Sequence, residues 1–472
     1  MGTKFQSLNG DTCIIADESI AQLEASMRGR LLRSTDADYD KSRQIWNGMI
    51  DKRPALIAEC FGTADVLAAV RFASEHDIIT SVRGGGHNIA GSAVCDDGLM
   101  IDLSNMRAVR VDPAAQRAWV QGGALLGDVD HETQAFGLAV PTGINSTTGI
   151  AGLALGGGYG WLSRAFGHTV DHLASAKIVT SDGALRHISE DGDADLFWAI
   201  RGGGGNFGVV TEFEFMLRPI DNMLMSGPVV HPIEDAAATL RAYRDAAASL
   251  PDEATCWLVL RKAPPLPFLA PEHYGKRVLL MPMAYVGPIE DGENALAPIR
   301  AIGPPLADGV APHPYTGWQS AFDPLLAEGA RNYWKSHDFS ELSDDLIDLM
   351  VAATANLPTD ECEIFIAQLG GAAGRVAPDA MAYAHRETRF VMNIHGRWQD
   401  PSQDAACKAW VRDLFDQASP LAEGSVYINF VPEPDEVRSK GAFGANQHRL
   451  EKIKGRFDPK NLFQANVAIE PR

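Results

Sequence analysis

The chain has 472 residues, of which 46% are hydrophobic and 22% are charged. This is the composition of a globular protein, and it excludes a disordered, fibrous or collagenous chain. The 41 Lys and Arg residues against 61 Asp and Glu residues give a net charge of −20, and no basic run interrupts the acidic excess. Nucleic acid and an anionic membrane surface are therefore poor partners, and we expect neither.

The cysteines and the first residues indicate where the protein works. The six cysteines occur singly, without a CxxC pair, so we expect reduced and mostly buried thiols. The N-terminus lacks a basic segment followed by an apolar one, and cytoplasmic localisation is the default expectation. The uncharged stretch 134–163 contains eight glycines and Pro141, which argue against a membrane span. We expect such a segment to line a buried ligand instead.

Helix and strand patterns alternate up to about residue 216. Residues 63–76 predict a helix with Thr63 as its N-cap, because Val66, Ala69, Val70 and Ala73 share one face. The β-branched run that follows predicts a buried strand. The strands expected in this half are 78–82, 100–103, 108–111, 117–121 and 207–215. Together these elements indicate an α+β domain.

The pattern changes from about residue 217 to 426. Long helices are expected at 233–249 and 405–418, and a strand is expected at 278–281. This segment predicts a second domain with a sheet covered on one side by helices. The last 45 residues return to a glycine-containing loop and a short helix at 447–454.

The strongest local motif is Arg83-Gly84-Gly85-Gly86-His87-Asn88, directly after a predicted strand. Three successive glycines let backbone N–H groups approach a ligand closely and form an anion-binding concavity, as a pyrophosphate requires. The alternative is a glycine turn that carries a surface histidine.

Two further glycine clusters follow, at 147–160 and 201–208. The first has more glycine than a helix or strand tolerates without a reason, which favours close backbone approach to a large ligand. The second contains a formal G-x-G-x-x-G at Gly203, Gly205 and Gly208. A nicotinamide-binding fingerprint needs a following helix, but a strand is expected there, so we reject that reading.

Several side chains allow a functional or a structural interpretation. His168 and His172 are four residues apart, but no third ligand accompanies them, so we expect no metal site. Trp334 and Lys335 fit a pocket or the core, and the core is slightly favoured. Strand alternation would place Tyr427 and Asn429 on one face, either as a buried polar pair or as part of a site.

In this order the glycine clusters resemble those of the berberine bridge enzyme-like oxidases, FAD-linked enzymes of the vanillyl-alcohol oxidase superfamily with a PCMH-type FAD-binding domain. The resemblance covers nearly the whole chain, including Tyr427-Ile428-Asn429 and Phe457-Asp458-Pro459 near its end. It implies an FAD-binding domain built from residues 1–216 and 427–472. The substrate domain, 217–426, would hold a large antiparallel sheet covered by helices.

The resemblance also implies how the flavin is held. His87 would bond covalently to the flavin 8α-methyl group. Many members form a second bond through a cysteine, but Asn145 stands at that position here, so we expect a single link. The residues expected to bind FAD are Arg83, Gly84, Gly85, Gly86, His87, Asn88, Thr147, Thr148, Gly149, Gly152, Gly157, Gly158, Gly160, Val210, Tyr427 and Asn429.

The expected catalytic residues are Tyr427, as the base, and its neighbour Asn429. A phenol with a pKa near 10 is a weak base at neutral pH, so Tyr427 would need a cation such as Lys335 or Arg397, or a hydrogen-bond donor. Asn393 and His395 alternate on a predicted strand and are further cavity candidates. Phe166 stands where many plant members have tyrosine, which puts any mechanism with two tyrosines in doubt.

Three functional readings follow from these residues. The main one is an oxidase that moves a hydride from an alcohol or amine carbon to flavin and then reduces O2 to H2O2. A small residue near the flavin, Thr148, would leave room for O2, although it would equally fit a role in hydrogen bonding. The others are a dehydrogenase with another acceptor and a flavin-binding protein with little turnover. The donor (sugar, aromatic alcohol or amine) and the oligomeric state stay open.

Overall fold

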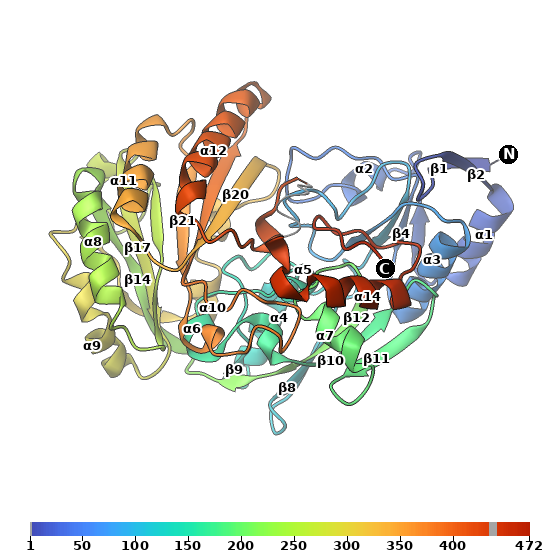
Figure 1. The fold of residues 1–472 in the computed structure, drawn as a ribbon, viewed down its shortest axis with the longest axis horizontal. Helices are drawn as coiled ribbons and strands as arrows, with labels where there is room; N and C mark the ends of the chain where they lie inside the picture. The colour runs from blue at the N-terminus through green and yellow to red at the C-terminus, as the bar shows by residue number, and fades with distance from the viewer. Residues whose placement is uncertain (1, 434–440) are drawn as a thin grey trace.

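The computed structural model describes residues 2–433 and 441–472 of an elongated molecule. A large antiparallel sheet lies at one end of it, and the first strands and helix of the chain lie at the other (Figure 1). This arrangement confirms the α+β class with a large antiparallel sheet. None of the described helices is long and apolar enough to cross a membrane.

The N-terminal half contains two larger sheets whose cores are separate. The four-stranded sheet has the order β3-β4-β6-β5, and its last three strands run parallel. Helices α1 and α3 pack on it through Val66, Val70 and Ile20. Its elements, with the hairpin and the short helix beside it, are β1 (Gly2–Gln6), β2 (Thr12–Ala16), α1 (Asp17–Ser26), β3 (Arg30–Leu32), α2 (Tyr39–Ser42), β4 (Leu56–Glu59), α3 (Thr63–Glu75), β5 (Thr80–Arg83) and β6 (Leu99–Asp102).

The second sheet of this half is antiparallel, in the order β11-β10-β12-β8-β7. Apolar side chains from alternate positions of β12, such as Phe213 and Phe215, enter its core. The elements of this part are β7 (Val109–Asp112), β8 (Arg117–Gln121), α4 (Leu126–Gln134), β9 (Leu138–Ala139), α5 (Ile150–Leu155), α6 (Ser163–Phe166), β10 (Leu173–Val179), β11 (Leu185–Ser189), α7 (Ala194–Ile200), β12 (Val209–Met216) and β13 (Arg218–Pro219).

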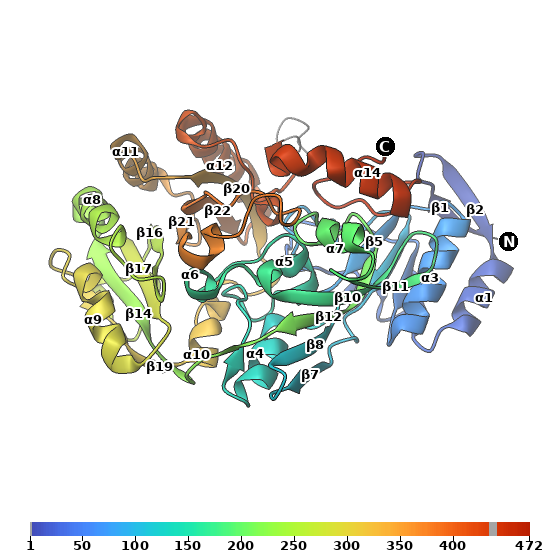
Figure 2. The same cartoon turned by 60° about the horizontal axis from the view of Figure 1, so that its bottom comes forward.

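The large sheet is formed by residues between 223 and 398, with the main order β18-β14-β17-β16-β21-β22-β20 and with β15 and β19 pairing at its side. Its helices α8, α9, α11 and α12 lie on the outer side, away from the rest of the molecule (Figure 2). The elements are β14 (Met223–Pro232), α8 (Ala236–Ala247), β15 (Ala254–Cys256), β16 (Leu258–Lys262), β17 (Arg277–Tyr285), α9 (Ile289–Arg300), β18 (Ala307–Asp308), β19 (Ala311–Pro314), α10 (Tyr315–Gln319), β20 (Arg331–Phe339), α11 (Asp344–Ala353), β21 (Glu363–Gln368), β22 (Phe390–Trp398) and α12 (Asp404–Ala418).

Strand register decides which side chains of the large sheet face the N-terminal half. In β22, Met392 and Ile394 enter the core below the helices, so Asn393 and His395 point the other way. Cross-strand pairing extends this inner face in rows, because Trp334, His395, Glu363 and Arg261 are successive partners. This row, which carries Arg261, Glu363 and His395, is thereby turned toward the centre of the molecule.

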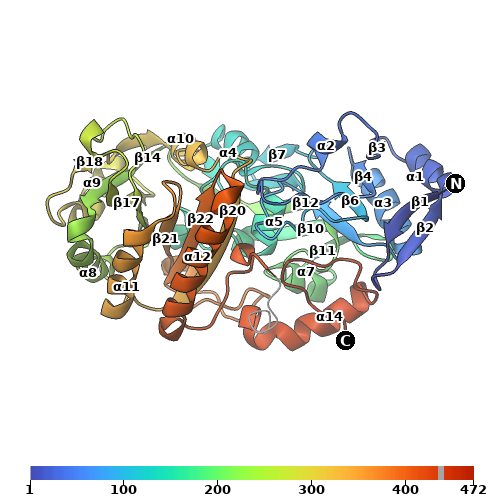
Figure 3. The ribbon, with the colours of Figure 1, turned by 90° about the horizontal axis from the view of Figure 1, so that it is seen from above.

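The C-terminal segment returns to the N-terminal half. Helix α14 (Gln447–Phe457) lies along α7 rather than beside the large sheet (Figure 3). After it, Phe463 forms a parallel bridge with Thr80 of β5. These contacts support the division into residues 1–216 with 427–472 and 217–426, which stays a proposal.

Most of the expected elements are present, with two local differences. The helix expected at 63–76 begins at Thr63, but Gly62 is its N-cap residue and no side chain caps it. The strand expected through Tyr427 and Asn429 is wrong, because Ile428–Phe430 forms a turn of 3₁₀ helix. All six cysteines are free thiols, and five of them are buried.

A fully buried lysine fixes the C-terminal segment. Lys454 Nζ donates to Asp458 Oδ2 at 2.6 Å, to the Asn206 carbonyl at 2.7 Å and to the Phe463 carbonyl at 2.6 Å. The ammonium group therefore joins α14, the end of the chain and the third glycine cluster in one hydrogen-bond network.

Lys454→Met should lower the free energy of unfolding by about 3–5 kcal/mol, because it leaves the Asp458 carboxylate buried without its cation. Lys460→Met is the matched control, since Lys460 and its partner Asp77 are both more than half exposed, and its cost should stay below about 1 kcal/mol. Chemical denaturation followed by tryptophan fluorescence measures both. Equal losses would contradict this account of the segment.

Candidate functional site

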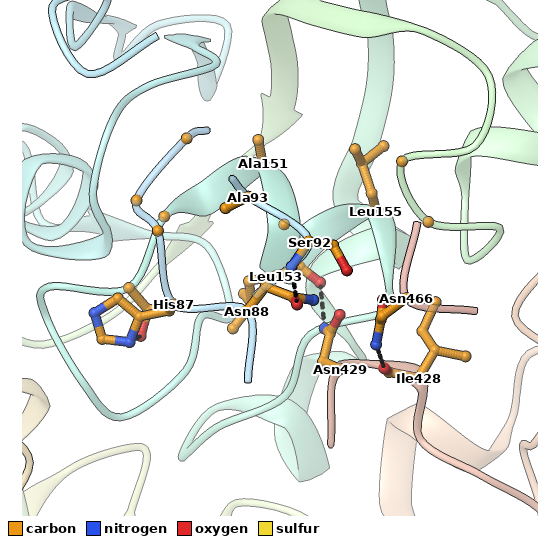
Figure 4. A pocket seen from close by; sticks show the side chains of 18 of the residues that line it. His87, Asn88, Ser92, Ala93, Ala151, Leu153, Leu155, Ile428, Asn429 and Asn466 are labelled. Atoms are coloured by element: carbon orange, nitrogen blue, oxygen red, sulfur yellow. Dashed lines mark hydrogen bonds between the residues drawn. The ribbon is translucent and has the colours of Figure 1, made fainter. Parts of the chain in front are cut away.

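One cavity runs between the N-terminal half, the C-terminal segment and the inner face of the large sheet. Figure 4 shows a part of it, where His87, Asn88 and Ser92 lie on one side and Ile428, Asn429 and Asn466 lie on the other. The lining therefore comes from segments that are hundreds of residues apart.

Two glycines bring the walls of this cavity together. A Cβ atom on Gly85 would lie 2.3 Å from the Gly149 nitrogen, and one on Gly149 would lie 2.3 Å from the Gly85 nitrogen. Any side chain at either position would force the two backbones apart. The glycines thus place the His87 loop (residues 83–88) directly beside the Thr147 loop (residues 145–149).

His87 is held by this contact. Its ring stacks on Trp46 with 5.0 Å between centroids, and its Nε2 lies 2.9 Å from Thr147 Oγ1. Its Nδ1 lies 3.4 Å from Thr148 Oγ1. Burial lowers the pKa of His87 to about 3, so the imidazole is neutral at pH 7.

The glycines that line the cavity leave room for a large ligand. A Cβ atom on Gly152, in the first turn of α5, or on Gly205 would meet nothing within 4 Å. Backbone is therefore exposed to the cavity at both places, which is what a phosphate-containing or planar ligand requires. The residues present fit an FAD group.

Most of the expected FAD-binding residues line this cavity. They come from both ends of the chain, which the fold brings together. Those lining it are Gly84, Gly85, Gly86, His87, Asn88, Thr148, Gly149, Gly152, Val210, Tyr427 and Asn429. Their binding of the cofactor stays a prediction.

Two expected residues with polar side chains have structural partners instead. Arg83 forms a double ion pair with Asp102 of β6, with Nε 2.9 Å from Oδ1, and it does not line the cavity. Thr147 is also outside the lining, where its hydroxyl donates to Asn145 Oδ1 at 2.7 Å. Both side chains therefore stabilise the loops rather than line the cavity.

The glycines at 157, 158 and 160 were expected to approach the ligand, but they pack against protein. Their Cβ positions would clash with Tyr383, Thr169 and the Thr142 carbonyl, respectively. Gly156 has a similar reason to lack a side chain, since a Cβ atom there would lie 2.3 Å from Asn429 Oδ1. This run of glycines therefore serves mainly the packing of the chain around the cavity.

Tyr427 and Asn429 meet, although not through a strand. Asn429 Nδ2 donates to Tyr427 Oη at 3.0 Å and to the Leu153 carbonyl at 3.3 Å. The two side chains are brought together by the 3₁₀ turn and not by the alternation of side chains along a strand. Figure 4 shows the bond from Asn429 to Leu153 across the cavity wall.

The pKa of Tyr427 is raised above the ordinary value of a tyrosine. Burial raises it to about 12, although hydrogen bonds from Asn429 and the Gly158 backbone partly lower it. Neither expected cation contributes. Lys335 lies over the Phe415 ring of α12 on the outer side of the sheet, and Arg397 is bound to Glu361 at 2.9 Å.

Further lining residues escaped the sequence analysis. Tyr159, inside the second glycine cluster, places its ring 4.9 Å from that of Tyr427, so a second tyrosine is present after all. Phe166 packs elsewhere, near Ala139 and Leu162. Trp334, which we favoured as core, lines the cavity with Trp257 and Glu363. Only the aromatic character of Tyr159 and Trp257 was visible in the sequence.

Asn393 and His395 both line the cavity, as strand alternation predicted. His168 and His172 do not line it. His168 packs edge-on against Tyr383, and His172 Nε2 lies 3.1 Å from the Phe166 carbonyl.

Two models of protein families match parts of this chain. Residues 54–189 match the model of an FAD-binding domain, and residues 426–470 match the model described as berberine and berberine like. The two matched segments contain the His87 and Thr147 loops and the Tyr427 turn. Both segments line the cavity, together with the third glycine cluster and the inner face of the large sheet.

Whole-chain relatives agree with these matches. An FAD-linked oxidoreductase of Dictyostelium discoideum is 30% identical over 463 residues, which cover 97% of this chain and 98% of that protein. The (R)-6-hydroxynicotine oxidase of Paenarthrobacter nicotinovorans is 28% identical, over 94% and 97% of the two chains. The crystal structure of 6-hydroxy-D-nicotine oxidase from Arthrobacter nicotinovorans superposes with a TM-score of 0.83 at 25% identity, covering 95% of this chain and 99% of that one.

These relatives match the chain from end to end, and the cavity has the open glycine backbone that their cofactor requires. The protein therefore belongs to the berberine bridge enzyme-like FAD-linked oxidoreductases.

Proposed function

We propose that the protein is an FAD-dependent oxidase that converts an alcohol or amine carbon of a small molecule to the carbonyl or imine level. The observation that carries this proposal is the cavity that joins the His87 loop to Tyr427. The cofactor would accept a hydride from the substrate carbon, and O2 would then take the two electrons to give H2O2.

Hydrogen bonding around His87 supports one covalent link, through Nδ1. The Thr147 hydroxyl gives its proton to Asn145 Oδ1, so Thr147 Oγ1 accepts from His87 Nε2–H. The neutral ring then keeps its lone pair on Nδ1, the nitrogen able to form a new bond. Asn145, at the position of the second linking residue, contributes by orienting Thr147.

The flavin should stay attached after denaturation, and a proteolytic peptide containing His87 should carry the flavin mass. His87→Ala should release all flavin in acid while still binding FAD through the glycine loops. Thr147→Val should slow attachment, because Nε2–H loses its acceptor, and should leave non-covalent binding intact. Mass spectrometry and acid precipitation measure these outcomes. Flavin found on another residue, or wholly released from the wild type, would refute the single link.

Tyr427, in its phenolate form, is the proposed acceptor of the substrate proton. Its phenol is protonated at neutral pH because its pKa is about 12. At pH 7 the phenolate fraction is about 10⁻⁵, and it grows about tenfold for each pH unit up to that pKa. Asn429, which donates to the phenol oxygen, favours the phenolate and thereby acts on the reaction through Tyr427.

Tyr427→Phe should slow anaerobic flavin reduction by about 10²–10⁴ while nearly preserving the visible flavin spectrum. In the wild type the reduction rate should rise with pH across the neutral and alkaline range, and in Tyr427→Phe this rise should disappear. Stopped-flow absorbance measures both. If the variant is reduced at the wild-type rate, Tyr427 merely packs in the cavity wall.

Thr148 supports O2 as the electron acceptor. It lines the cavity next to His87, and its short side chain leaves space that a larger residue would fill. The two other readings differ in measurable ways. A dehydrogenase would be reduced by substrate but would react slowly with O2, and a binding protein would not be reduced.

After anaerobic reduction, the wild-type flavin should reoxidise in air-saturated buffer much faster than free flavin, and Thr148→Leu should slow this step by about tenfold or more. Thr148→Val is the matched control, since it removes the hydroxyl but keeps the volume, and it should resemble the wild type. Slow reoxidation of the wild type would favour the dehydrogenase reading. Equal rates in wild type and Thr148→Leu would remove the argument from Thr148 only.

A further inference from the structure

Two of the buried cysteines, Cys362 and Cys407, meet on the outer side of the large sheet. Cys362 directly precedes β21, and Cys407 lies in the first turn of α12, the helix that packs on β20 and β22 (Figure 3). Both side chains are fully buried in the core beneath the helices. Their thiols are hydrogen-bonded to each other. The packing of α12 on the sheet therefore joins two thiols that are distant in sequence.

The amphipathic pattern of α12 determines where Cys407 lies. Cys407 is the first residue of the buried face, which continues with Trp410, Val411 and Leu414. The preceding residue, Ala406, is exposed. The Cys407 thiol thus belongs to the core but lies one residue away from solvent.

Hydrogen bonds to the end of β22 fix Cys362. Thr359 Oγ1 donates to the Arg397 carbonyl at 2.7 Å and accepts from the Cys362 backbone N–H at 3.2 Å. The Cys362 thiol itself lies 3.5 Å from the same carbonyl. Asp360, within this turn, is exposed. The two sulfur atoms are therefore held in place just below the protein surface.

The residues on either side of Cys362 are ion-paired. Glu361 Oε2 lies 2.9 Å from Arg397 Nε, and Glu363 Oε2 lies 2.5 Å from Arg261 Nη1. Glu363 lines the cavity, whereas Cys362 enters the core on the other side of the sheet. A covalent bond at Cys362 would therefore restrain the segment that carries Glu363 into the cavity wall.

The two thiols differ in acidity. A hydrogen bond from Cys407 lowers the pKa of Cys362 below the ordinary range of a thiol, against the effect of burial. The same hydrogen bond, together with burial, raises the pKa of Cys407. In Cys256, another cysteine of this core, burial raises the pKa. An acidic thiol beside a second thiol favours disulfide formation, because the first attacks an oxidant and the second then displaces the oxygen.

We propose that Cys362 and Cys407 form a redox-active pair, which hydrogen peroxide converts to a disulfide between the start of β21 and the first turn of α12. The Cys362 thiolate attacks one peroxide oxygen, the O–O bond breaks, and a sulfenic acid and hydroxide form. The Cys407 sulfur then attacks the Cys362 sulfur, and the S–O bond breaks. The Cys407 proton leaves with that oxygen as water, and the Cys362 proton converts the hydroxide to water. The two sulfurs lose two electrons, and one peroxide becomes two waters.

This inference goes beyond the proposed oxidase function and does not depend on it. An oxidase would release peroxide into the cavity, on the other face of the same strand. The pair would react equally with peroxide from any other source. Added peroxide therefore tests the pair even if the proposed flavin chemistry is wrong.

The flavin-containing protein is first reduced with dithiothreitol, freed of the reductant and then treated with H2O2. A proteolytic digest analysed without reduction should contain the Cys362 and Cys407 peptides joined by a disulfide. Two of the six thiols should disappear on titration in denaturant, and dithiothreitol should restore them. Recovery of the two cysteines on separate peptides, as thiols or as sulfonic acids, would overturn the proposal.

The disulfide should also make the protein harder to unfold, because it closes the loop 362–407 in the unfolded chain. Oxidation should raise the Tm of the wild type by about 3 °C or more. Cys407→Ser should abolish both the joined peptides and this rise. Cys256→Ser, at an equally buried position of the same core, is the matched control and should retain both.

Two outcomes of the thermal measurement would contradict the proposed cross-link between α12 and β21. One is an unchanged Tm of the wild type after the disulfide has formed. The other is an equal rise in Cys407→Ser, which would assign the effect to other oxidised groups. If either variant does not fold, the wild-type digest still decides whether the two cysteines pair.

Discussion

The contact between Gly85 and Gly149 is the constraint on which the site depends. The two backbones are so close that neither residue tolerates a Cβ atom. This approach sets the His87 loop against the Thr147 loop, and the hydrogen bonds from Asn145 through Thr147 to His87 follow from it. The proposed state of the histidine, neutral with its lone pair on Nδ1, is therefore a consequence of chain packing.

The other half of the site is supplied by the return of the chain end. Lys454, buried among three oxygen atoms, fixes α14 to the third glycine cluster, and Asn466 donates to the Ile428 carbonyl at 2.8 Å. Tyr427 is thereby held between the glycine-rich wall and the large sheet. The sheet completes the cavity with a row of paired polar residues, which keeps its charge balanced without an added ion.

The sequence analysis correctly predicted the features that depend on local residue patterns. Periodicity located helices such as α3 and α12, and alternation correctly turned Asn393 and His395 to one face of β22. The glycine clusters indicated the cavity, but they did not tell glycines that face the cavity, such as Gly152, from those that pack on protein, such as Gly158. That distinction depends on neighbours distant in sequence.

Long-range pairing accounts for the remaining differences. The pairing of Glu363 with Arg261 follows from strand register, and local sequence patterns do not predict it. Register also placed Lys335 on the outer face, away from Tyr427, and Trp334 on the inner one. Tyr427 and Asn429 meet as expected, but by a 3₁₀ turn, because the chain bends there toward Leu153.

The central claim is that one cavity holds the flavin between His87 and Tyr427 and the substrate against the inner face of the large sheet. A crystal structure of the purified, flavin-containing protein tests it most directly. The account predicts flavin density continuous with His87 Nδ1 and the flavin ring beside Tyr427, with open space left between the ring and the large sheet. Density that ends before His87, or that places the flavin ring away from Tyr427, would contradict it.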